Sequence, residues 1–242
     1  MVFMGSKDRL SKEICPIIQK YIDETDAKVY IEPFVGGANV IDKIKCIKRI
    51  GIDINLPLIT LLKYVQNHPD ISIAPEDVSF EHYADVRSNQ NTGKYSPEYV
   101  ALIGYCASYG GRYFDGGYGR DARGDRGIYK ERLRNLKEQA PKLDGIKFYN
   151  HDYKDLTDIK NAVIYCDPPY RGVKRYSKQQ IDYEEFYDWC RKYSENNIVI
   201  VSEFEMPDDF ECIWEKPRKI LQKSDRITGI TKVEHLFVLK NK

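Results

Sequence analysis

Along the first third of the chain, the apolar residues follow helical spacing in some segments and form short continuous blocks in others. Across 8–22 the apolar residues follow helical spacing, and Pro16 is expected to kink or shorten that helix. Short apolar blocks at 29–34 and 49–55 predict strands, whereas periodic blocks predict helices at 38–47 and 56–67. Because strands that alternate with helices are typical of a doubly wound parallel sheet, we predict an α/β fold.

Residues 68–140 break this pattern, because polar, aromatic and turn residues dominate there. Two helices are still expected inside the region, near 96–108 and at 128–139. The sheet pattern then resumes, with strands expected at 145–153, 162–166, 198–204 and 233–239 and a helix at 186–197. We therefore predict one sheet domain, residues 1–67 and 141–242, which carries residues 68–140 as a small, mostly helical inserted lobe.

The composition is ordinary for a globular protein and gives no sign of a membrane or secretory segment. Charged residues make up 31% of the chain, and the net charge is +1. No apolar run approaches the roughly 18 residues that a membrane span needs, and residues 1–14 lack the apolar core of a secretion signal. The six cysteines are scattered without a CxxC pair, which favours a reduced cytoplasmic protein without a structural metal site.

Charge is unevenly distributed, although the total is close to zero. Residues 109–137 hold eight Lys or Arg against four acidic residues, and residues 216–232 hold six against one. Local basic faces of this kind can bind a phosphate backbone. A solvated surface is the simpler interpretation of either segment taken alone.

The segment Asp167-Pro168-Pro169-Tyr170 is the strongest candidate for chemistry. It follows the apolar block 162–166, at the carboxyl end of a strand, where open α/β sheets bind ligands. Two prolines fix the backbone and remove two N–H donors. The Asp167 carboxylate and the Pro168 carbonyl can then each accept a hydrogen bond from an exocyclic amine such as adenine N6, while Tyr170 stacks on the base. A base inside a duplex cannot reach such a turn, so it would have to be flipped out.

A second turn suits a cofactor that contains adenosine. Gly36 and Gly37 follow the strand predicted at 29–34, and glycines let a backbone approach a ligand closely. Asp53 ends the next strand, where an acidic residue can bind ribose hydroxyls. Either feature alone is weak evidence, because an ordinary strand–helix turn with a solvent-facing Asp has the same sequence. Together they predict a cofactor site, and the sequence lacks the GxGxxG pattern of NAD sites.

These segments resemble those of the Dam-like, D12 class DNA adenine N6-methyltransferases over nearly the whole chain. The similar segments are MGSK (4–7), YIEPFVGG (30–37), GIDIN (51–55), FYNHDY (148–153) and DPPY (167–170), together with the less specific closing segments VSEFEMP (201–207) and KVEHLFVL (232–239). Their order, with the cofactor loop before the lobe and DPPY after it, is that of the α group of amino-methyltransferases. One departure is Ala38, which stands where the family's FxGxG loop has its second glycine.

The resemblance implies a Rossmann-like methyltransferase sheet that transfers a methyl group from S-adenosylmethionine to N6 of a flipped-out adenine in double-stranded DNA. It implies catalytic roles for Asp167, Pro168, Pro169 and Tyr170. It also implies cofactor contacts by Lys7, Glu32, Pro33, Phe34, Gly36, Gly37, Asp53, Asp152 and Asp167. We expect no metal and no obligate protein partner. The implied location is the cytoplasm of a bacterium or of a phage-infected host, with or without a separate restriction endonuclease.

Candidate DNA contacts lie in two segments that combine basic and aromatic residues. Residues 105–120 interleave aromatics, glycines and arginines; Arg can bind guanine or phosphate, and an aromatic ring can fill the gap left by a flipped base. We select Tyr109, Arg112, Tyr113 and Arg120 in the lobe, and Arg171, Lys174 and Arg175 after DPPY. Local packing of the tyrosines and exposed loop charge are the alternative interpretations.

Three other functions fit part of the sequence. N4-cytosine methyltransferases share this organisation but more often carry SPPY. Methylation of RNA or of a protein glutamine is a second alternative, although the glutamine enzymes typically carry NPPY without an intervening lobe. A catalytically silent DNA-binding protein could keep the fold, but the intact Lys7, Asp53 and DPPY argue against it. The sequence predicts neither a recognition site nor an oligomeric state, and it assigns no role to Glu203.

Overall fold

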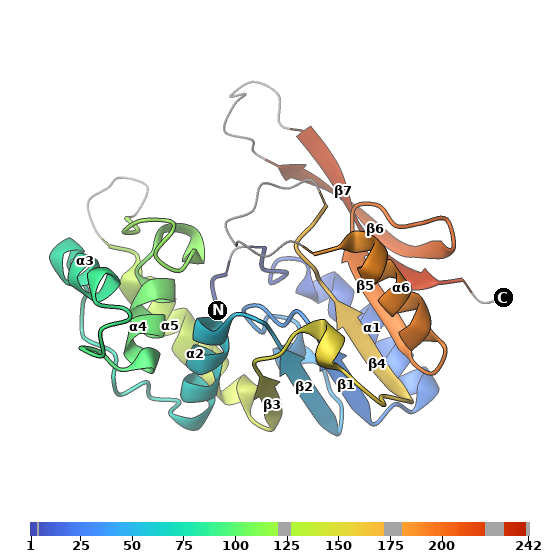
Figure 1. The fold of residues 1–242 in the computed structure, drawn as a ribbon, viewed down its shortest axis with the longest axis horizontal. Coiled ribbons are helices and arrows are strands. Elements are labelled where there is room, and N and C mark those ends of the chain that lie inside the picture. Colours follow the sequence, from blue (N-terminus) through green and yellow to red (C-terminus); the bar gives the residue numbers. More distant parts are fainter. Residues whose placement is uncertain (4, 121–126, 172–180, 221–229, 241–242) are drawn as a thin grey trace.

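The computed structural model describes the chain apart from residues 4, 121–126, 172–180, 221–229 and 241–242. Its centre is a seven-stranded sheet in the order β3-β2-β1-β4-β5-β7-β6 (Figure 1). Five neighbouring strands are parallel: β1 (Val29–Glu32), β2 (Lys48–Ile52), β3 (Ile146–Tyr149), β4 (Ala162–Cys166) and β5 (Ile198–Glu203). The strand β7 (Ile230–Leu239) runs antiparallel to both β5 and β6 (Phe210–Ile220).

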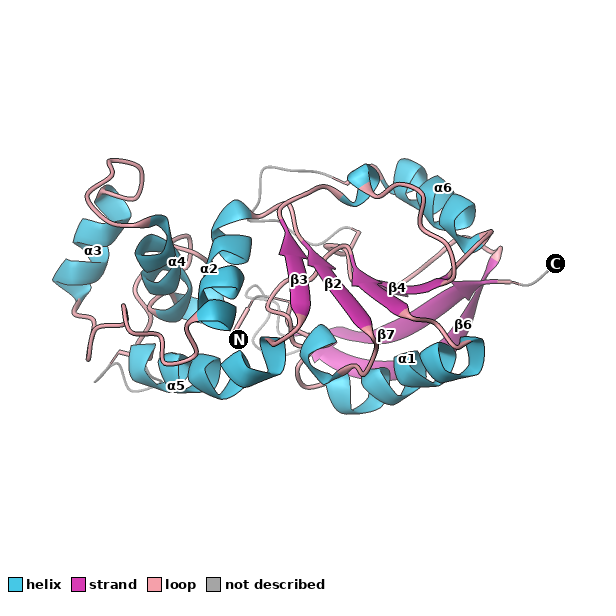
Figure 2. Cartoon of the chain, turned by 90° about the horizontal axis from the view of Figure 1, so that it is seen from below, coloured by secondary structure: helices cyan, strands magenta, loops and turns pink. Residues whose placement is uncertain are grey.

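Helices cover both faces of the sheet. In β4, Tyr165 belongs to the hydrophobic cluster that includes α1 (Ser11–Thr25), whereas its neighbour Ile164 packs in the cluster that includes α6 (Tyr183–Ser194). Successive side chains of a strand point to opposite faces, so the apolar run of β4 fills both cores. Figure 2 shows α1 and α6 on opposite sides of the strands. The predicted doubly wound α/β fold is confirmed.

The remaining helices gather beyond the β3 edge of the sheet (Figure 1). The helix α2 (Leu56–Asn67) packs on α4 (Pro97–Cys106), which also contacts α3 (Phe80–Ser88) and α5 (Tyr129–Gln139). Buried residues of these helices and of α1 form one continuous hydrophobic cluster. The inserted region is therefore helical and shares its core with the α1 face of the sheet, while the domain boundaries at 67 and 141 stay a prediction.

Polar caps start three of these helices. Asn55, Ser79 and Ser96 accept hydrogen bonds from backbone N–H groups in the first turns of α2, α3 and α4. Such caps satisfy donors that have no partner inside the helix. Short 3₁₀ turns complete the structure: η1 (Ile41–Lys43), η2 (Tyr109–Gly111), η3 (Ala140–Leu143) and η4 (Tyr153–Asp155).

The prediction of a helix at 38–47 is wrong, because this segment forms only the short 3₁₀ turn η1. Ala38 has a left-handed φ of 56°, which a right-handed helix cannot contain. The Gln139 side chain donates to the carbonyl oxygens of Gly37 and Ala38, each at 3.0 Å. A side chain from α5 therefore satisfies backbone groups at the point where the helix was expected to begin, and the apolar residues that follow are buried in the core.

Two observed elements have no counterpart in the sequence prediction. Only Tyr83 and Val86 are buried in α3, so its apolar period is too short to identify a helix. The strand β6 is an edge strand that contains Pro217 and a register shift between Cys212 and Trp214. Proline and bulges are tolerated at sheet edges, and they obscure the alternating pattern of a strand.

Two other expectations concern membranes and metals. Among the described helices, none is both long and apolar enough to span a bilayer. All six cysteines are free thiols. Cys212, Glu215 and His235 place one ligand atom each within 4.8 Å of one another on the surface of β6 and β7. The expectation that the protein holds no metal stays a prediction.

Candidate active site

The two turns that carry the candidate chemistry lie at the same edge of the sheet. β1 and β4 are parallel neighbours, and their register pairs Ile31 with Ile164. The chain leaves both strands in the same direction, after Glu32 and after Cys166. Because neighbouring strands are about 4.8 Å apart, the glycine loop after β1 and the DPPY turn after β4 start side by side at the carboxyl edge.

Lys7 links the DPPY turn to β7. Its Nζ lies 2.6 Å from Asp167 Oδ1 and 3.1 Å from Glu234 Oε1. The side chains of Lys7 and Glu234 are 4% and 0% exposed, and that of Asp167 is 19% exposed. Charges this far from water are costly unless they are paired. The ammonium group between two carboxylates therefore compensates charge at the catalytic candidate Asp167.

Several contacts fix the ring of Tyr170. Its hydroxyl donates to Glu234 Oε1 and lies 3.1 Å from Ser202 Oγ of β5. Lys7 Nζ lies over the ring at 4.5 Å from the centroid. The Phe204 ring packs edge-on against it, with 4.4 Å between centroids. These contacts fix the orientation of Tyr170, and its stacking on a base stays a prediction.

Glu203 holds the residue that follows DPPY. It is 2% exposed, its Oε2 accepts the backbone N–H of Arg171 at 3.3 Å, and its Oε1 accepts that of Phe204 at 2.7 Å. Burial raises the pKa of Glu203 to about 7, because the ionised carboxylate loses its water. A carboxyl with a pKa this close to neutrality, next to a candidate catalytic turn, is typical of functional sites.

Glu32 contacts the core at the end of β1. It is 3% exposed, and the fully buried Tyr30 donates a hydrogen bond from its hydroxyl to Glu32 Oε1 at 2.7 Å. Burial raises the pKa of Glu32 well above its ordinary value, and the negative charge of Asp167 adds to the effect. The structure therefore gives Glu32 a partner inside the protein, and its predicted contact with the cofactor stays a prediction.

Asp53 fixes the glycine loop. Its Oδ2 accepts the backbone N–H of Gly36 at 3.1 Å, and its Oδ1 accepts that of Asn55 at 2.9 Å. Burial raises the pKa of Asp53. An ionised carboxylate offers about four acceptor positions, so these two bonds leave capacity for hydroxyl donors such as those of a ribose.

Packing accounts for the two glycines of this loop. A Cβ atom at Gly36 would meet the Phe3 ring at 3.2 Å, and one at Gly37 would lie 2.7 Å from Asn39 Nδ2. Gly36 also has a left-handed φ of 48°. The sequence argument assigns the glycines to the approach of a ligand, whereas the structure shows the approach of residues 1–3. The glycine contact with a ligand stays a prediction.

The other predicted cofactor residues have structural partners. Pro33 is buried. The Phe34 ring packs against Tyr153 and Phe186 on the α6 face, at 5.3 and 5.8 Å between centroids. Asp152 caps η4, because its side chain accepts a backbone N–H of that turn. These contacts fix the walls beside the glycine loop, and no cofactor contact is tested by them.

The aromatic segment 105–120 folds around a buried serine. Ser108 Oγ accepts the backbone N–H of Phe114 at 2.9 Å and lies 3.0 Å from the Tyr83 hydroxyl. Arg132 of α5 donates from its guanidinium to the Ser108 carbonyl. Hydrogen bonds from α3 and α5 therefore hold this loop in one conformation.

The predicted DNA contacts of the lobe fall into two groups. Tyr109 is 59% exposed, and Arg120 is exposed with its guanidinium 5.7 Å from the Tyr118 ring. Arg112 and Tyr113 are half-buried, and the Tyr113 ring packs against the core. The surface position of Tyr109 and Arg120 suits an interface, whereas local packing accounts for Tyr113.

The predicted contacts after DPPY are described only in part. Arg171 is exposed, with its guanidinium 5.8 Å from the Tyr183 ring. Lys174 and Arg175 lie outside the described residues. The second basic segment, 216–232, also falls largely outside them.

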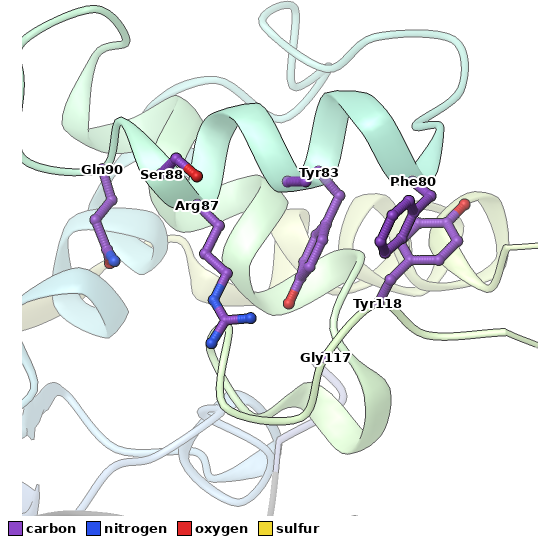
Figure 3. Close-up of a pocket in the computed structure, with 8 residues that line it drawn as sticks. Phe80, Tyr83, Arg87, Ser88, Gln90, Gly117 and Tyr118 are labelled. Atoms are coloured by element: carbon purple, nitrogen blue, oxygen red, sulfur yellow. The ribbon is translucent and has the colours of Figure 1, made fainter.

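A hollow of about 390 Å³ opens on the lobe between α3 and residues 117–118 (Figure 3). Figure 3 shows the Arg87 side chain extending from α3 toward the loop that carries Gly117. The other lining residues are mostly aromatic or polar: Phe80, Tyr83, Ser88, Gln90 and Tyr118, with Ala84 between them. Arginine and glutamine are side chains that read base edges. The sequence analysis missed this surface because it missed α3.

Three residues that organise the site were also missed: Gln139, Ser202 and Glu234. The sequence does contain a signal for Glu234. In a strand, Glu234, Leu236 and Val238 lie on the same face, and Leu236 and Val238 are both buried. An acid at a register position that faces the core is unusual and needs a partner. Gln139 gives no comparable signal, because its contact with the glycine loop depends on how α5 ends.

The sheet with β7 inserted antiparallel between β5 and β6, and with DPPY at its carboxyl edge, defines a Rossmann-like methyltransferase. The sequence model of the D12 class N6 adenine-specific DNA methyltransferase family matches residues 3–199. The chain belongs to this family.

Two named relatives are methyltransferases. The chain is 27% identical over 199 residues to the type II methyltransferase M.MjaIII of Methanocaldococcus jannaschii, a match that covers 72% of this chain and 69% of that protein. It is 25% identical over 192 residues to the modification methylase StsI of Streptococcus sanguinis, covering 69% of this chain but only 28% of StsI. Among solved structures, PH1948 from Pyrococcus horikoshii aligns with a TM-score of 0.41 and 10% identity, over 96% of this chain and 84% of that one.

Proposed function

We propose that the protein transfers a methyl group from S-adenosylmethionine to N6 of an adenine that is flipped out of double-stranded DNA. The observation that carries this proposal is the adjacency of two turns on neighbouring parallel strands. The DPPY turn with Asp167 paired to Lys7 follows β4, and the glycine loop fixed by Asp53 follows β1. Membership of an adenine-specific family selects N6 as the acceptor of the methyl group.

The residues of the glycine loop suit this cofactor. S-adenosylmethionine, when bound, supplies a methyl group on a positively charged sulfur. Asp53 has acceptor capacity beyond its bonds to Gly36 and Asn55, which fits ribose hydroxyls. Phe34 and Asp152 border the same edge and would hold the adenosine half, as the family resemblance implies.

The DPPY turn would activate the target amine. The Asp167 carboxylate and the Pro168 carbonyl accept hydrogen bonds from the two N6 hydrogens, which draws the nitrogen lone pair out of conjugation with the ring. Asp167 and Pro168 would thus aim the lone pair of N6 at the methyl group, which S-adenosylmethionine would supply as its carbon–sulfur bond breaks and the sulfur keeps the bonding pair. The N6 proton leaves to water. Alignment of this kind lowers a barrier by several kcal/mol.

Product analysis tests the proposal. Purified protein is incubated with unmethylated duplex DNA and S-adenosylmethionine that is tritiated on the methyl group, and the DNA is then digested to nucleosides. We expect the label in N6-methyldeoxyadenosine. Label in N4-methyldeoxycytidine would show that the target is cytosine N4 and not adenine N6. DNA without label would overturn the proposal.

The variant Asp167→Asn tests the role of the acceptor. Asparagine keeps the shape, but its neutral carbonyl oxygen is a weaker acceptor than a carboxylate, and it gives up the ion pair with Lys7. We expect the single-turnover methylation rate to fall about 100- to 1000-fold, while calorimetry shows that S-adenosylmethionine still binds. A rate that stays within about tenfold of wild type would exclude the assigned role.

A further inference from the structure

We propose that Glu234 is a positioning residue of the methyl-transfer site, which holds Lys7 and Tyr170 and so fixes both ends of the DPPY turn. The inference rests on the proposed function. Glu234 lies on β7, beyond the residues 3–199 that the family's sequence model matches. The contacts that define its role are those with the N-terminal segment, β5 and the DPPY turn.

Three donors from separate parts of the chain meet at one oxygen of Glu234. Lys7 Nζ lies 3.1 Å from Oε1, and Ser202 Oγ donates to the same atom at 3.2 Å. The Tyr170 hydroxyl donates to it as well. The N-terminal segment, the strand β5 and the DPPY turn are thus joined at a single carboxylate.

The burial of Glu234 argues against a role in packing alone. The side chain is 0% exposed, and burial raises its pKa, an effect that the Lys7 charge opposes. A buried ion pair stabilises a fold no better than a well-packed apolar residue of similar volume. The same face of β7 carries the apolar Leu236 and Val238. A carboxylate at this register position is therefore best explained by the partners that it orients.

Glu234 acts on the DPPY side of the site. Lys7 lies between Asp167 and Glu234, so the ion pair with Glu234 fixes the position of the ammonium group beside Asp167. The Tyr170 ring is held at its hydroxyl end. The glycine loop is fixed separately, by Asp53 and Gln139. Loss of Glu234 should therefore slow methyl transfer more than it weakens cofactor binding.

The test compares Glu234→Gln with Glu215→Gln. Glutamine keeps the size of Glu234 but removes the charge that holds Lys7. The control removes the same charge at an exposed position of β6, the strand that pairs with β7. We expect Glu234→Gln to lower the single-turnover rate at least about tenfold, with the S-adenosylmethionine dissociation constant changed less than about threefold. The control should stay within about twofold of wild type in both.

A double-mutant cycle with Lys7→Met separates positioning from a general structural effect. Glutamine keeps a carbonyl oxygen that can still accept the Tyr170 hydroxyl, so this substitution tests the contact with Lys7 alone. Glu234→Gln should therefore slow the Lys7→Met protein by less than about twofold, because the ammonium group that the charge positions is gone. Losses that multiply would overturn the inference, and so would a Glu234→Gln rate within about twofold of wild type.

If Glu234→Gln does not fold, Tyr170→Phe tests the second contact of Glu234, the hydrogen bond from the Tyr170 hydroxyl. This change keeps the ring and removes only the hydroxyl that Glu234 accepts. We expect a rate loss of at least about fivefold in protein that is still folded at the assay temperature, and a rate within about twofold of wild type would overturn the inference. Wild-type protein that leaves adenine unmethylated would overturn both the proposed function and this inference, whereas active wild type with an unaffected Glu234→Gln variant overturns the inference alone.

Discussion

The carboxyl edge of the sheet and the inserted lobe are organised in different ways. At the edge, charged side chains such as Lys7, Glu203 and Glu234 are buried, and each has a defined partner. In the lobe, Ser108 fixes the backbone of the loop from inside, while Arg120 stays at the surface. At the edge, the contacts therefore fix the positions of charged side chains. In the lobe, they fix the backbone of the loop, and side chains such as Arg120 extend from it at the surface. Substitutions at the edge should change cofactor affinity, rate or pH response, and those in the lobe should change DNA affinity.

The largest effect in this comparison is expected at the glycine loop. Asp53→Ala removes the acceptor for Gly36 and, in the proposed function, the acceptor for the ribose hydroxyls. Hydrogen bonds to a charged group contribute about 1.5–3 kcal/mol each, so we expect the S-adenosylmethionine dissociation constant to rise about 100-fold in calorimetry.

The control for this variant is Asp144→Ala. Asp144 is exposed just before β3, at the opposite end of the strands, and its loss should leave the affinity unchanged. Equal affinities of the Asp53 and Asp144 variants would contradict the assignment of the glycine loop to the cofactor.

A pH-dependent effect is expected at Glu203. Its pKa is raised by burial to about 7, so between its ordinary pKa and about 7 the folded protein binds more protons than the unfolded chain. The free energy of unfolding therefore falls as pH rises through this window, and Gln cannot titrate. From pH 5 to pH 8, wild type should lose about 2 kcal/mol of stability relative to Glu203→Gln in urea unfolding.

The matched control for Glu203 is the exposed Glu205, changed in the same way. The pH-dependent loss of wild-type stability should be larger relative to Glu203→Gln than relative to Glu205→Gln. If the two losses are equal, the buried carboxyl does not titrate near neutrality.

The smallest effect is expected in the lobe. Arg120→Ala removes an exposed charge from the segment 105–120, and we expect the DNA dissociation constant to rise about fivefold, with the salt slope of binding reduced by about one. Lys20→Ala on α1 removes one exposed charge far from the lobe and should leave both quantities unchanged. Titration by fluorescence anisotropy at several salt concentrations measures both, and identical behaviour of the two variants would place the DNA interface elsewhere.

The sequence predicted the sheet and its edge well for a physical reason. Strands β1, β2, β4 and β5 are short apolar runs that end at turn residues, so their ends and the residues that follow them can be identified directly. Asp53 and Asp167 were found in this way, and the structure brings their two turns to one edge.

What the sequence could not predict depends on contacts between distant segments. The segment 38–47 has the composition of a helix, but Gln139 and the left-handed Ala38 give it another backbone. Glu234 meets Lys7 only because β7 inserts between β5 and β6. Local pattern carries no information about such pairings, whereas the hollow beside α3 was missed because that helix buries only Tyr83 and Val86 and so shows no clear apolar period.

The pairing of Lys7 with Glu234 has a consequence for protein synthesis. A ribosome makes Lys7 before any of the described strands and Glu234 only with β7, which then has to insert between two strands made before it. A polypeptide interrupted before β7 would leave Lys7 without this carboxylate and β5 without its neighbour. The charge arrangement of Lys7, Asp167 and Glu234 is therefore complete only after β7 has taken its place in the sheet.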